Sequence, residues 1–186
     1  MSSDMVRDAA NDLITDRLSI DGTFIWGLKM YFSTRFVQAK PSTPNLFQTS
    51  NAIHALLDAY QATGDSYFAD VADKAVSSCL SQLGVVGSST GRYCRYYPEM
   101  EIPVYNVNAS FSSCCLRLSC LGVGKADVKR QLSEDLLAFV LRGQRPDGSW
   151  PYADDKAGQW VDGYHTGYVL EALGYFLISS LRLWAL

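Results

Sequence analysis

The sequence repeats itself about every 57 residues, and this repeat restricts its fold more than any other feature. Three segments of similar pattern are centred on Asn51, Asn108 and His165, and each is 57 residues from the next. The same offset relates two Ala-Asp-Val triplets, at 69–71 and 126–128. A repeat of this length indicates a supersecondary unit that stacks on its neighbours to bury its apolar face.

Each unit has the pattern of a helical hairpin. After Asn51 apolar residues recur at helical spacing, and Gly64-Asp65 interrupts the pattern before a second apolar helix starts. A short extra helix is expected at 26–37 and a brief extended pair at 92–97. The sequence therefore predicts one all-α domain over 1–186. It has six or seven helices that alternate between outer and inner positions, at 3–17, 49–63, 66–83, 106–121, 126–143 and 164–183.

Composition and charge exclude several classes of protein. The net charge is −3, so there is no basic surplus for nucleic-acid binding. No apolar run reaches the roughly 18 residues of a membrane span, and the N-terminus lacks the apolar stretch of a secretory signal. The five cysteines include no C-x-x-C pair, which indicates buried thiols in a reducing cytoplasm; a zinc site is the alternative.

One motif resembles a known superfamily. The segment QRPDGSW at 144–150 fits Q-x-x-x-G-x-W and resembles the QW motif of α/α-toroid proteins, which include squalene cyclases and protein prenyltransferases. The segment at 160–167 resembles the start of an inner helix in six-hairpin carbohydrate-active enzymes such as unsaturated glucuronyl hydrolases, polysaccharide lyases and sugar epimerases. The resemblance implies repeated α-hairpins in a partial α/α toroid. Since a full toroid has about twelve helices, we expect a half-toroid or a fragment, completed by a second half or by homo-oligomerisation.

The sequence departs from two activities of that superfamily. Terpene cyclases carry a D-x-D-D acid motif, and the nearest segment here, at 152–155, lacks the first aspartate. Prenyltransferases bind zinc through Asp, Cys and His; Asp162 and His165 fit that set, but no cysteine lies in an equivalent loop. We therefore expect neither a bound metal nor another cofactor.

The repeat suggests where a site would lie. Asn51, Asn108 and His165 occupy equivalent positions near the start of three inner helices, whose ends converge on one mouth of a toroid. Free N–H groups at helix N-termini suit a carboxylate or a sugar hydroxyl. The alternative is that each asparagine only caps its own helix.

Two histidines are candidates for proton transfer. Asp162 lies three residues before His165 and would orient its imidazole, with Tyr164 beside the pair. These three are the predicted catalytic residues. His54 and Asp58 share one helix face at i and i+4, as a proton pair or as an ordinary surface pair.

Aromatic side chains near the loops favour a saccharide as the ligand, because the C–H faces of sugar rings stack on flat rings. Repeat packing is the alternative explanation of these aromatics, and no pair of acids for glycoside hydrolysis stands out. The sequence thus favours a carbohydrate-active domain of hydrolase, lyase or epimerase type. An isoprenoid-processing protein and a non-catalytic scaffold are the alternatives. The predicted substrate-binding residues are Asn51, Asn108, His54, Tyr105 and Trp160.

Overall fold

The computed structural model describes residues 2–20 and 22–183, with side chains up to Ser179. The described part contains six α-helices: α1 (Ser3–Thr15), α2 (Leu46–Thr63), α3 (Ser66–Gln82), α4 (Tyr105–Cys120), α5 (Ala126–Arg142) and α6 (Gly163–Leu183). Its other elements are one 3-10 turn and two antiparallel hairpins: η1 (Lys156–Gly158), β1 (Phe32–Ser33) with β2 (Gln38–Ala39), and β3 (Val85–Ser88) with β4 (Gly91–Cys94). The prediction of an all-α fold is confirmed.

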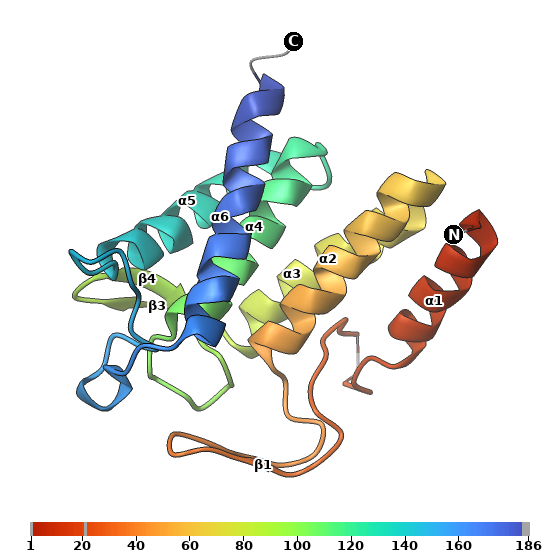
Figure 1. The fold of residues 1–186 in the computed structure, drawn as a ribbon. Coiled ribbons are helices and arrows are strands. Elements are labelled where there is room, and N and C mark those ends of the chain that lie inside the picture. The colour runs from red at the N-terminus through yellow and green to blue at the C-terminus, as the bar shows by residue number, and fades with distance from the viewer. Residues whose placement is uncertain (1, 21, 184–186) are drawn as a thin grey trace.

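The helices form two layers (Figure 1). Helix α4 is central and packs on α2, α5 and α6, while α2 packs on α1 and α3. The inner layer is α2, α4 and α6, and the outer layer is α1, α3 and α5. The chain therefore alternates between outer and inner helices in the predicted order. None of the helices in the described ranges is both long and apolar enough to cross a membrane.

Local capping signals explain where the first hairpin turns. Asn45 precedes α2 and accepts a hydrogen bond from the backbone N–H of Gln48 at 2.9 Å. Gly64 ends α2 in the left-handed conformation, with φ of 71°, which glycine adopts without a Cβ clash. Asp65 then caps α3 by accepting from the N–H of Tyr67 at 3.1 Å. At the predicted break, Gly64 therefore ends α2 and Asp65 starts α3.

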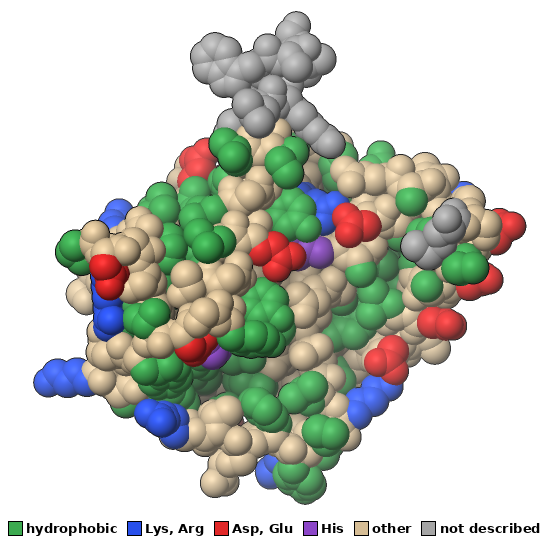
Figure 2. Space-filling view, viewed as in Figure 1, with side chains coloured by type: hydrophobic (Ala, Val, Ile, Leu, Met, Phe, Trp, Pro, Cys, Tyr) green, Lys and Arg blue, Asp and Glu red, His purple; other side chains and the backbone are tan. Residues whose placement is uncertain are grey.

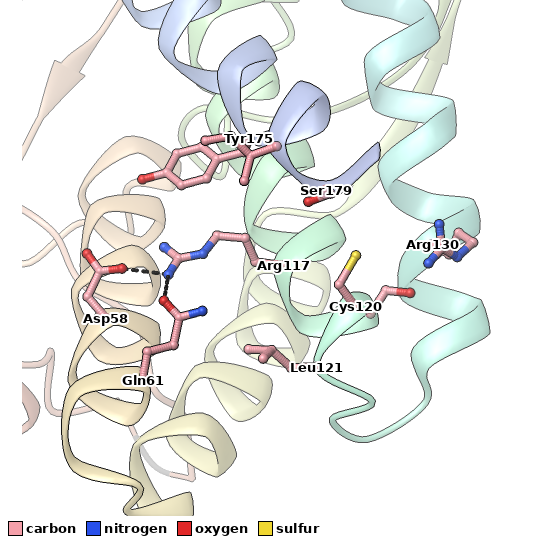
Figure 3. A pocket seen from close by; sticks show the side chains of 10 residues that line it. Asp58, Gln61, Arg117, Cys120, Leu121, Arg130, Tyr175 and Ser179 are labelled. Atoms are coloured by element: carbon pink, nitrogen blue, oxygen red, sulfur yellow. Dashed lines mark hydrogen bonds and ion pairs between the residues drawn. The ribbon is translucent and has the colours of Figure 1, made fainter. Parts of the chain in front are cut away.

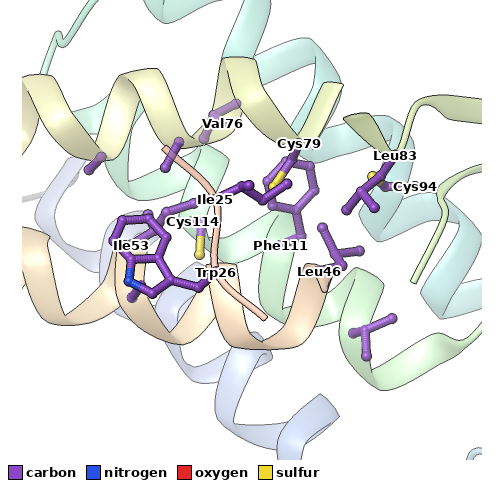
Figure 4. Packing of buried hydrophobic residues seen from close by; sticks show 14 of the residues in the cluster. Ile25, Trp26, Leu46, Ile53, Val76, Cys79, Leu83, Cys94, Phe111 and Cys114 are labelled. Atoms are coloured by element: carbon purple, nitrogen blue, oxygen red, sulfur yellow. The ribbon is translucent and has the colours of Figure 1, made fainter. Parts of the chain in front are cut away.

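The main core lies between α1, α2, α3 and α4 (Figure 4). Ile25 and Trp26 enter it from the connection that follows α1, and the indole Nε1 of Trp26 donates to the carbonyl of Leu13 at 2.9 Å. All five cysteines are free thiols, and four are buried. Burial raises the pKa of the Cys114 thiol far above its usual range, so this thiol is an inert packing group. The prediction of buried, unpaired cysteines is confirmed for these four.

A second cluster joins α5 to α6 through the 144–150 loop. Trp150 is buried, packs with Phe139 and Val169, and donates from Nε1 to the carbonyl of Val140 at 2.8 Å. Gly148 turns the loop with φ of 86°. The tryptophan therefore packs between an outer helix and the next inner helix.

The prediction of a short helix at 26–37 is wrong. This segment is an irregular connection that ends in the β1–β2 hairpin, where Phe32 pairs with Ala39. A Cβ at Gly27 would lie 2.1 Å from the carbonyl oxygen of Thr43, so the chain needs glycine to pass here. Aromatic and β-branched residues around the turn suit a hairpin better than a helix. The extended pair expected at 92–97 exists in part, because β4 pairs with β3 instead.

The structural repeat is slightly longer than the sequence repeat. The inner helices begin at residues 46, 105 and 163, which are separated by 59 and 58 residues. Asn51 therefore lies in the second turn of α2, whereas Asn108 and His165 lie in the first turns of α4 and α6. Counted from the helix starts, these three positions are not equivalent, because the 57-residue sequence repeat does not match the spacing at which the inner helices begin.

Candidate functional site

A cleft of about 520 Å³ opens at the N-terminal ends of α2, α4 and α6. Its other walls are the β1–β2 hairpin with the residues around it, the Tyr96-Tyr97 segment, and the loop before α6. Figure 2, in the same view as Figure 1, shows hydrophobic side chains gathered on the lower part of this face, where these elements meet. The cleft lies at the end of the inner helices where the sequence predicted a cavity.

Three nearly parallel aromatic rings form one wall of the cleft. Tyr152 and Trp160 lie 4.6 Å apart between ring centroids with an interplanar angle of 11°. Phe36, from the hairpin, lies 5.7 Å from each of them and nearly parallel to both. The guanidinium of Arg35 sits over the ring of Trp160, 4.8 Å from its centroid. The cleft thus combines flat apolar faces with one cation, and Arg35 has no acidic partner among the described residues.

His165 and Asp162 meet at the edge of this wall. The ring Nδ1 of His165 lies 2.7 Å from Oδ2 of Asp162, and the backbone N–H of His165 donates to Oδ1 at 2.8 Å. The indole Nε1 of Trp160 also donates to Oδ2, at 3.2 Å. Partial burial favours the neutral acid, but these hydrogen bonds outweigh it and lower the pKa of Asp162. An ionised Asp162 therefore holds the Nδ1–H tautomer of His165 and leaves Nε2 without a hydrogen-bond partner in the described structure.

Asp162 also starts helix α6, which gives a testable prediction. Its Oδ1 caps the N–H of His165 in the first turn, so Asp162→Ala is expected to lower the free energy of unfolding by about 1 kcal/mol. Asp162→Asn keeps a good N-cap and is expected to recover most of that loss. Urea denaturation of the two variants measures the difference. Equal losses in both would show that the cap does not explain the effect.

The floor of the cleft contains an unsatisfied polar group. Asn106, in the first turn of α4, is 5% exposed and lines the cleft. Its Oδ1 is buried and has no hydrogen-bond partner among the described residues. Burial also raises the pKa of the neighbouring Tyr96, so this phenol stays a neutral hydrogen-bonding group. An unpaired buried acceptor is costly, and a bound O–H or N–H would satisfy it.

His54, a predicted substrate-binding residue, lies outside the cleft in a hydrogen-bonded network. Arg117 donates from one Nη to His54 Nδ1 at 2.9 Å and from the other to Asp58 at 2.5 Å. Because arginine only donates, Nδ1 is the acceptor and Nε2 carries the proton, which faces Ser113 Oγ at 3.1 Å. The predicted His54–Asp58 proton pair is therefore wrong: Asp58 pairs with Arg117.

This network forms one side of a second cavity at the opposite ends of the inner helices (Figure 3). The cavity has a volume of about 380 Å³. Tyr175 of α6 packs on two members of the network: its ring stacks on His54 with 4.7 Å between centroids, and its centroid lies 5.0 Å from the Arg117 guanidinium. Burial, and then the charge of Arg117, lower the pKa of His54 to about 4, so its imidazole is neutral at pH 7. These groups bond to one another and link α2, α4 and α6.

Asn108 and Tyr105, two other predicted binding residues, are packed inside the protein. Asn108 is fully buried and uses its amide to bridge both backbone groups of Cys94 and the carbonyl of Val104. Tyr105 is 3% exposed and stacks on Phe139 at 4.8 Å. Neither lines the cleft.

Asn51 is exposed on α2 and borders a small pocket of about 20 Å³ with His54. The structure therefore does not assemble the polar ring of Asn51, Asn108 and His165 that the repeat suggested.

The structure brings four predicted residues together at the cleft: His165, Tyr164 and Trp160 line it, and Asp162 lies behind His165. Tyr164 is 65% exposed and contacts the imidazole edge-on at 5.4 Å. Sequence reasoning missed Arg35, Phe36 and Asn106. The first two lie in the segment expected to be helical. The available signal for a turn was Ser33-Thr34 between aromatic residues, since the Thr34 hydroxyl accepts from the backbone N–H groups of Phe36 and Val37. Nothing in the described residues groups three or more His, Cys, Asp or Glu side chains as a metal site would require.

A comparison with solved structures finds a similar fold. The crystal structure of an unsaturated glucuronyl hydrolase specific for heparin superposes with a TM-score of 0.61 and 13% sequence identity, over 93% of this chain and 52% of that one. This chain has the fold of a partial α/α toroid. It spans about half the length of that hydrolase, and at this identity the likeness concerns the fold. No protein-family model and no curated protein sequence matches.

Proposed function

We propose that residues 1–186 form a carbohydrate-active half-toroid domain whose cleft binds an anionic saccharide. The observation that carries this proposal is the aromatic wall of Phe36, Tyr152 and Trp160 beside Arg35, in a described lining that contains no carboxylate. Flat rings suit the C–H faces of sugars, and an unpaired guanidinium suits a carboxylate or sulfate group. The structural neighbour acts on a polyanionic saccharide, heparin, which agrees with this choice.

The proposed chemistry is proton transfer by His165. Asp162 fixes the imidazole through Nδ1, and the free Nε2 is available to take up or release a proton. Hydrolysis by paired carboxylates requires two acids about 5–10 Å apart across the glycosidic bond, and the described lining supplies neither. A lyase- or epimerase-type step, in which a base removes a proton from the sugar, fits this half of the site better. Tyr164, against the imidazole, completes the proposed catalytic group.

Binding of a heparin hexasaccharide, measured by isothermal titration calorimetry, tests the proposal. Trp160→Ala is expected to raise Kd at least about tenfold, equivalent to about 1.4 kcal/mol. The substitution removes one aromatic face for the sugar and the ring on which the Arg35 guanidinium lies. Arg35→Gln is expected to weaken binding and to reduce its dependence on salt. Tyr31→Ala is the matched control, since Tyr31 is 78% exposed on the same segment and does not line the cleft.

Two further ligands separate the proposal from its alternatives. A neutral oligosaccharide of the same length is expected to bind more weakly, since it offers nothing to Arg35. Farnesyl diphosphate tests for an isoprenoid site. If it binds more tightly than the hexasaccharide and competes with it, the carbohydrate proposal is wrong. The absence of binding by every ligand would also contradict the proposal and would favour a scaffold.

A further inference from the structure

The cavity towards the C-terminal ends of the inner helices is separate from the saccharide cleft. Residues of α2, α4, α5 and α6 contribute to its lining, and none of them lines the cleft. Asn106 at the cleft and Cys120 at this cavity lie at opposite ends of α4, about 20 Å apart along the helix axis. A ligand bound here would therefore leave the cleft unoccupied, whatever the cleft itself binds.

Arg130 of α5 brings an unpaired positive charge to this cavity (Figure 3). Its own helix offers two acidic neighbours at ion-pair spacing, Asp127 three residues before it and Glu134 four residues after it. Arg130 pairs with neither of them, nor with any other acid in the described part of the chain. Its side chain is partly buried and lines the cavity instead.

Two hydroxyl groups in the lining are also without partners. Ser119 of α4 and Ser179 of α6 line the cavity, and neither side chain makes a hydrogen bond to another residue that the structure describes. Other helical serines of this chain, such as Ser50 and Ser78, donate to the carbonyl four residues earlier. A guanidinium and two hydroxyls are the kind of donors from which a carboxylate accepts hydrogen bonds.

The ionised side chains that line the cavity sum to one positive charge. Asp58 is the one carboxylate in the described lining, and its Oδ1 accepts from Arg117 at 2.5 Å. Arg117 also donates to His54 and Gln61, so its guanidinium is used within the network. Arg130 is therefore the charge that lacks a counterion, and one anionic group would balance it.

Capping of a helix end is the other role that a cation has at this place, because the C-terminal ends of helices attract positive charge. Backbone N–H groups of the following turn already donate to the carbonyls of 117–119 in α4. Lys129, next to Arg130, donates to the carbonyl of Val123 in that turn and pairs with Asp73. Arg130 makes no hydrogen bond to a carbonyl of the described residues, so capping does not explain its position.

The remaining walls of the cavity are apolar. Leu121 follows α4, and Tyr175 and Ile178 belong to α6. The volume of about 380 Å³ falls within the range of small-molecule sites. We propose that this cavity binds a small organic monoanion, whose carboxylate accepts from Arg130 and the two serine hydroxyls while its apolar part lies against Leu121 and Ile178.

Cys120 is a chemical reporter of this site, because it lines the cavity and is exposed, whereas the other four thiols are buried. Iodoacetate and iodoacetamide both alkylate a thiolate with loss of iodide, but only iodoacetate carries a carboxylate. The ratio of their rates at Cys120, measured by mass spectrometry on the intact chain, reports attraction of an anion to the cavity. A change in the thiolate fraction affects both reagents equally and cancels in this ratio.

Arg130→Gln is expected to lower the iodoacetate-to-iodoacetamide ratio at least about fivefold, because it removes the unpaired charge from the cavity. Lys125→Gln is the matched control. It removes the same charge from an exposed position just before α5 that does not line the cavity, and it is expected to change the ratio less than about twofold. An equal decrease in both variants, or a decrease in neither, would overturn the proposal.

Sodium hexanoate tests for a bound ligand. At about 50 mM it is expected to slow the alkylation of Cys120 by iodoacetamide at least about fivefold, since a weak small ligand binds with a millimolar Kd. The uncharged hexan-1-ol is expected to give no protection, and Arg130→Gln is expected to lose the protection by hexanoate. Equal protection by hexan-1-ol, protection retained in Arg130→Gln, or no protection by hexanoate would each overturn the proposal.

Binding of the heparin hexasaccharide to Arg130→Gln separates this proposal from the one made for the cleft. Arg130 does not line the cleft, so the Kd of the hexasaccharide is expected to stay within about twofold of the wild-type value. A variant that loses hexanoate protection and keeps hexasaccharide binding would show two independent sites. Loss of both would show that the two ligands share one site and would overturn the proposal of a second one.

Discussion

Asn108→Ala is expected to lower the free energy of unfolding by about 3 kcal/mol, although the substitution removes no charge and little apolar surface. The Asn108 amide accepts from the N–H of Cys94 at 2.7 Å and donates to the carbonyls of Cys94 and Val104 at 3.1 and 2.8 Å. Alanine leaves these backbone groups unpaired in a site from which water is excluded, and each buried unpaired group costs about 1–3 kcal/mol. Urea denaturation measures the loss.

Asn51→Ala is the matched control for Asn108→Ala. Asn51 also lies on an inner helix, but its side chain is exposed, so its loss is expected to change stability by less than about 0.5 kcal/mol. A change of less than about 1 kcal/mol in Asn108→Ala would mean that the end of β4 re-pairs without the amide. The two variants together distinguish an asparagine that stabilises the fold, Asn108, from one at the matching position of the sequence repeat, Asn51, that does not.

Stability is expected to fall as pH is lowered from about 6.5 to 4, and His54 is the main cause of the fall. The folded-state pKa of His54 is lowered to about 4 by burial and then by Arg117, whereas the unfolded chain has the ordinary value of 6.5. Between these values the unfolded state binds a proton that the folded state does not, so acid favours unfolding. The loss at pH 4 is on the order of 3 kcal/mol.

His54→Gln isolates this contribution. Glutamine can accept from Arg117 and donate to Ser113, as the neutral imidazole does, but it does not titrate. The free energies of unfolding of both proteins are measured by urea denaturation from pH 7 to pH 4. The wild-type value is expected to fall more steeply by the amount given above, while contributions from Asp162 and other carboxylates cancel in the difference. Parallel curves would show that His54 does not carry the pH dependence.

Local chemistry allowed most of the helices to be predicted. The turn at Gly64-Asp65 needs only a residue that adopts a positive φ and a side chain that caps the next helix, and both signals are adjacent in sequence. The helix prediction for 26–37 failed because the hairpin found there depends on Phe36 stacking on Tyr152 and Trp160, more than 100 residues away in sequence. Helical spacing of a few apolar residues could not reveal those partners.

In the candidate site, too, contacts between residues close in sequence could be predicted and contacts between distant segments could not. His165 and Asp162 are three residues apart at the start of a helix, so their hydrogen bond is nearly a property of the local chain. Arg35 and Asn106 join them in one cleft only because the hairpin and α4 converge on the same end of the inner layer. His54 is the opposite case. Asp58, four residues away on the same helix, was its predicted partner, but both side chains accept hydrogen bonds from Arg117 of α4 instead.

The sequence by itself determined that this chain would be a set of helical hairpins in a two-layer arc, since caps, turns and apolar spacing act within a few residues. It could not determine which polar side chains would face a ligand. A shift of one or two residues in the repeat turns a side chain to another face of its helix, and this shift buries Asn108 while leaving His165 at the cleft. Tertiary packing made that choice, because burial of a polar group is tolerated only where the surrounding chains supply its hydrogen bonds.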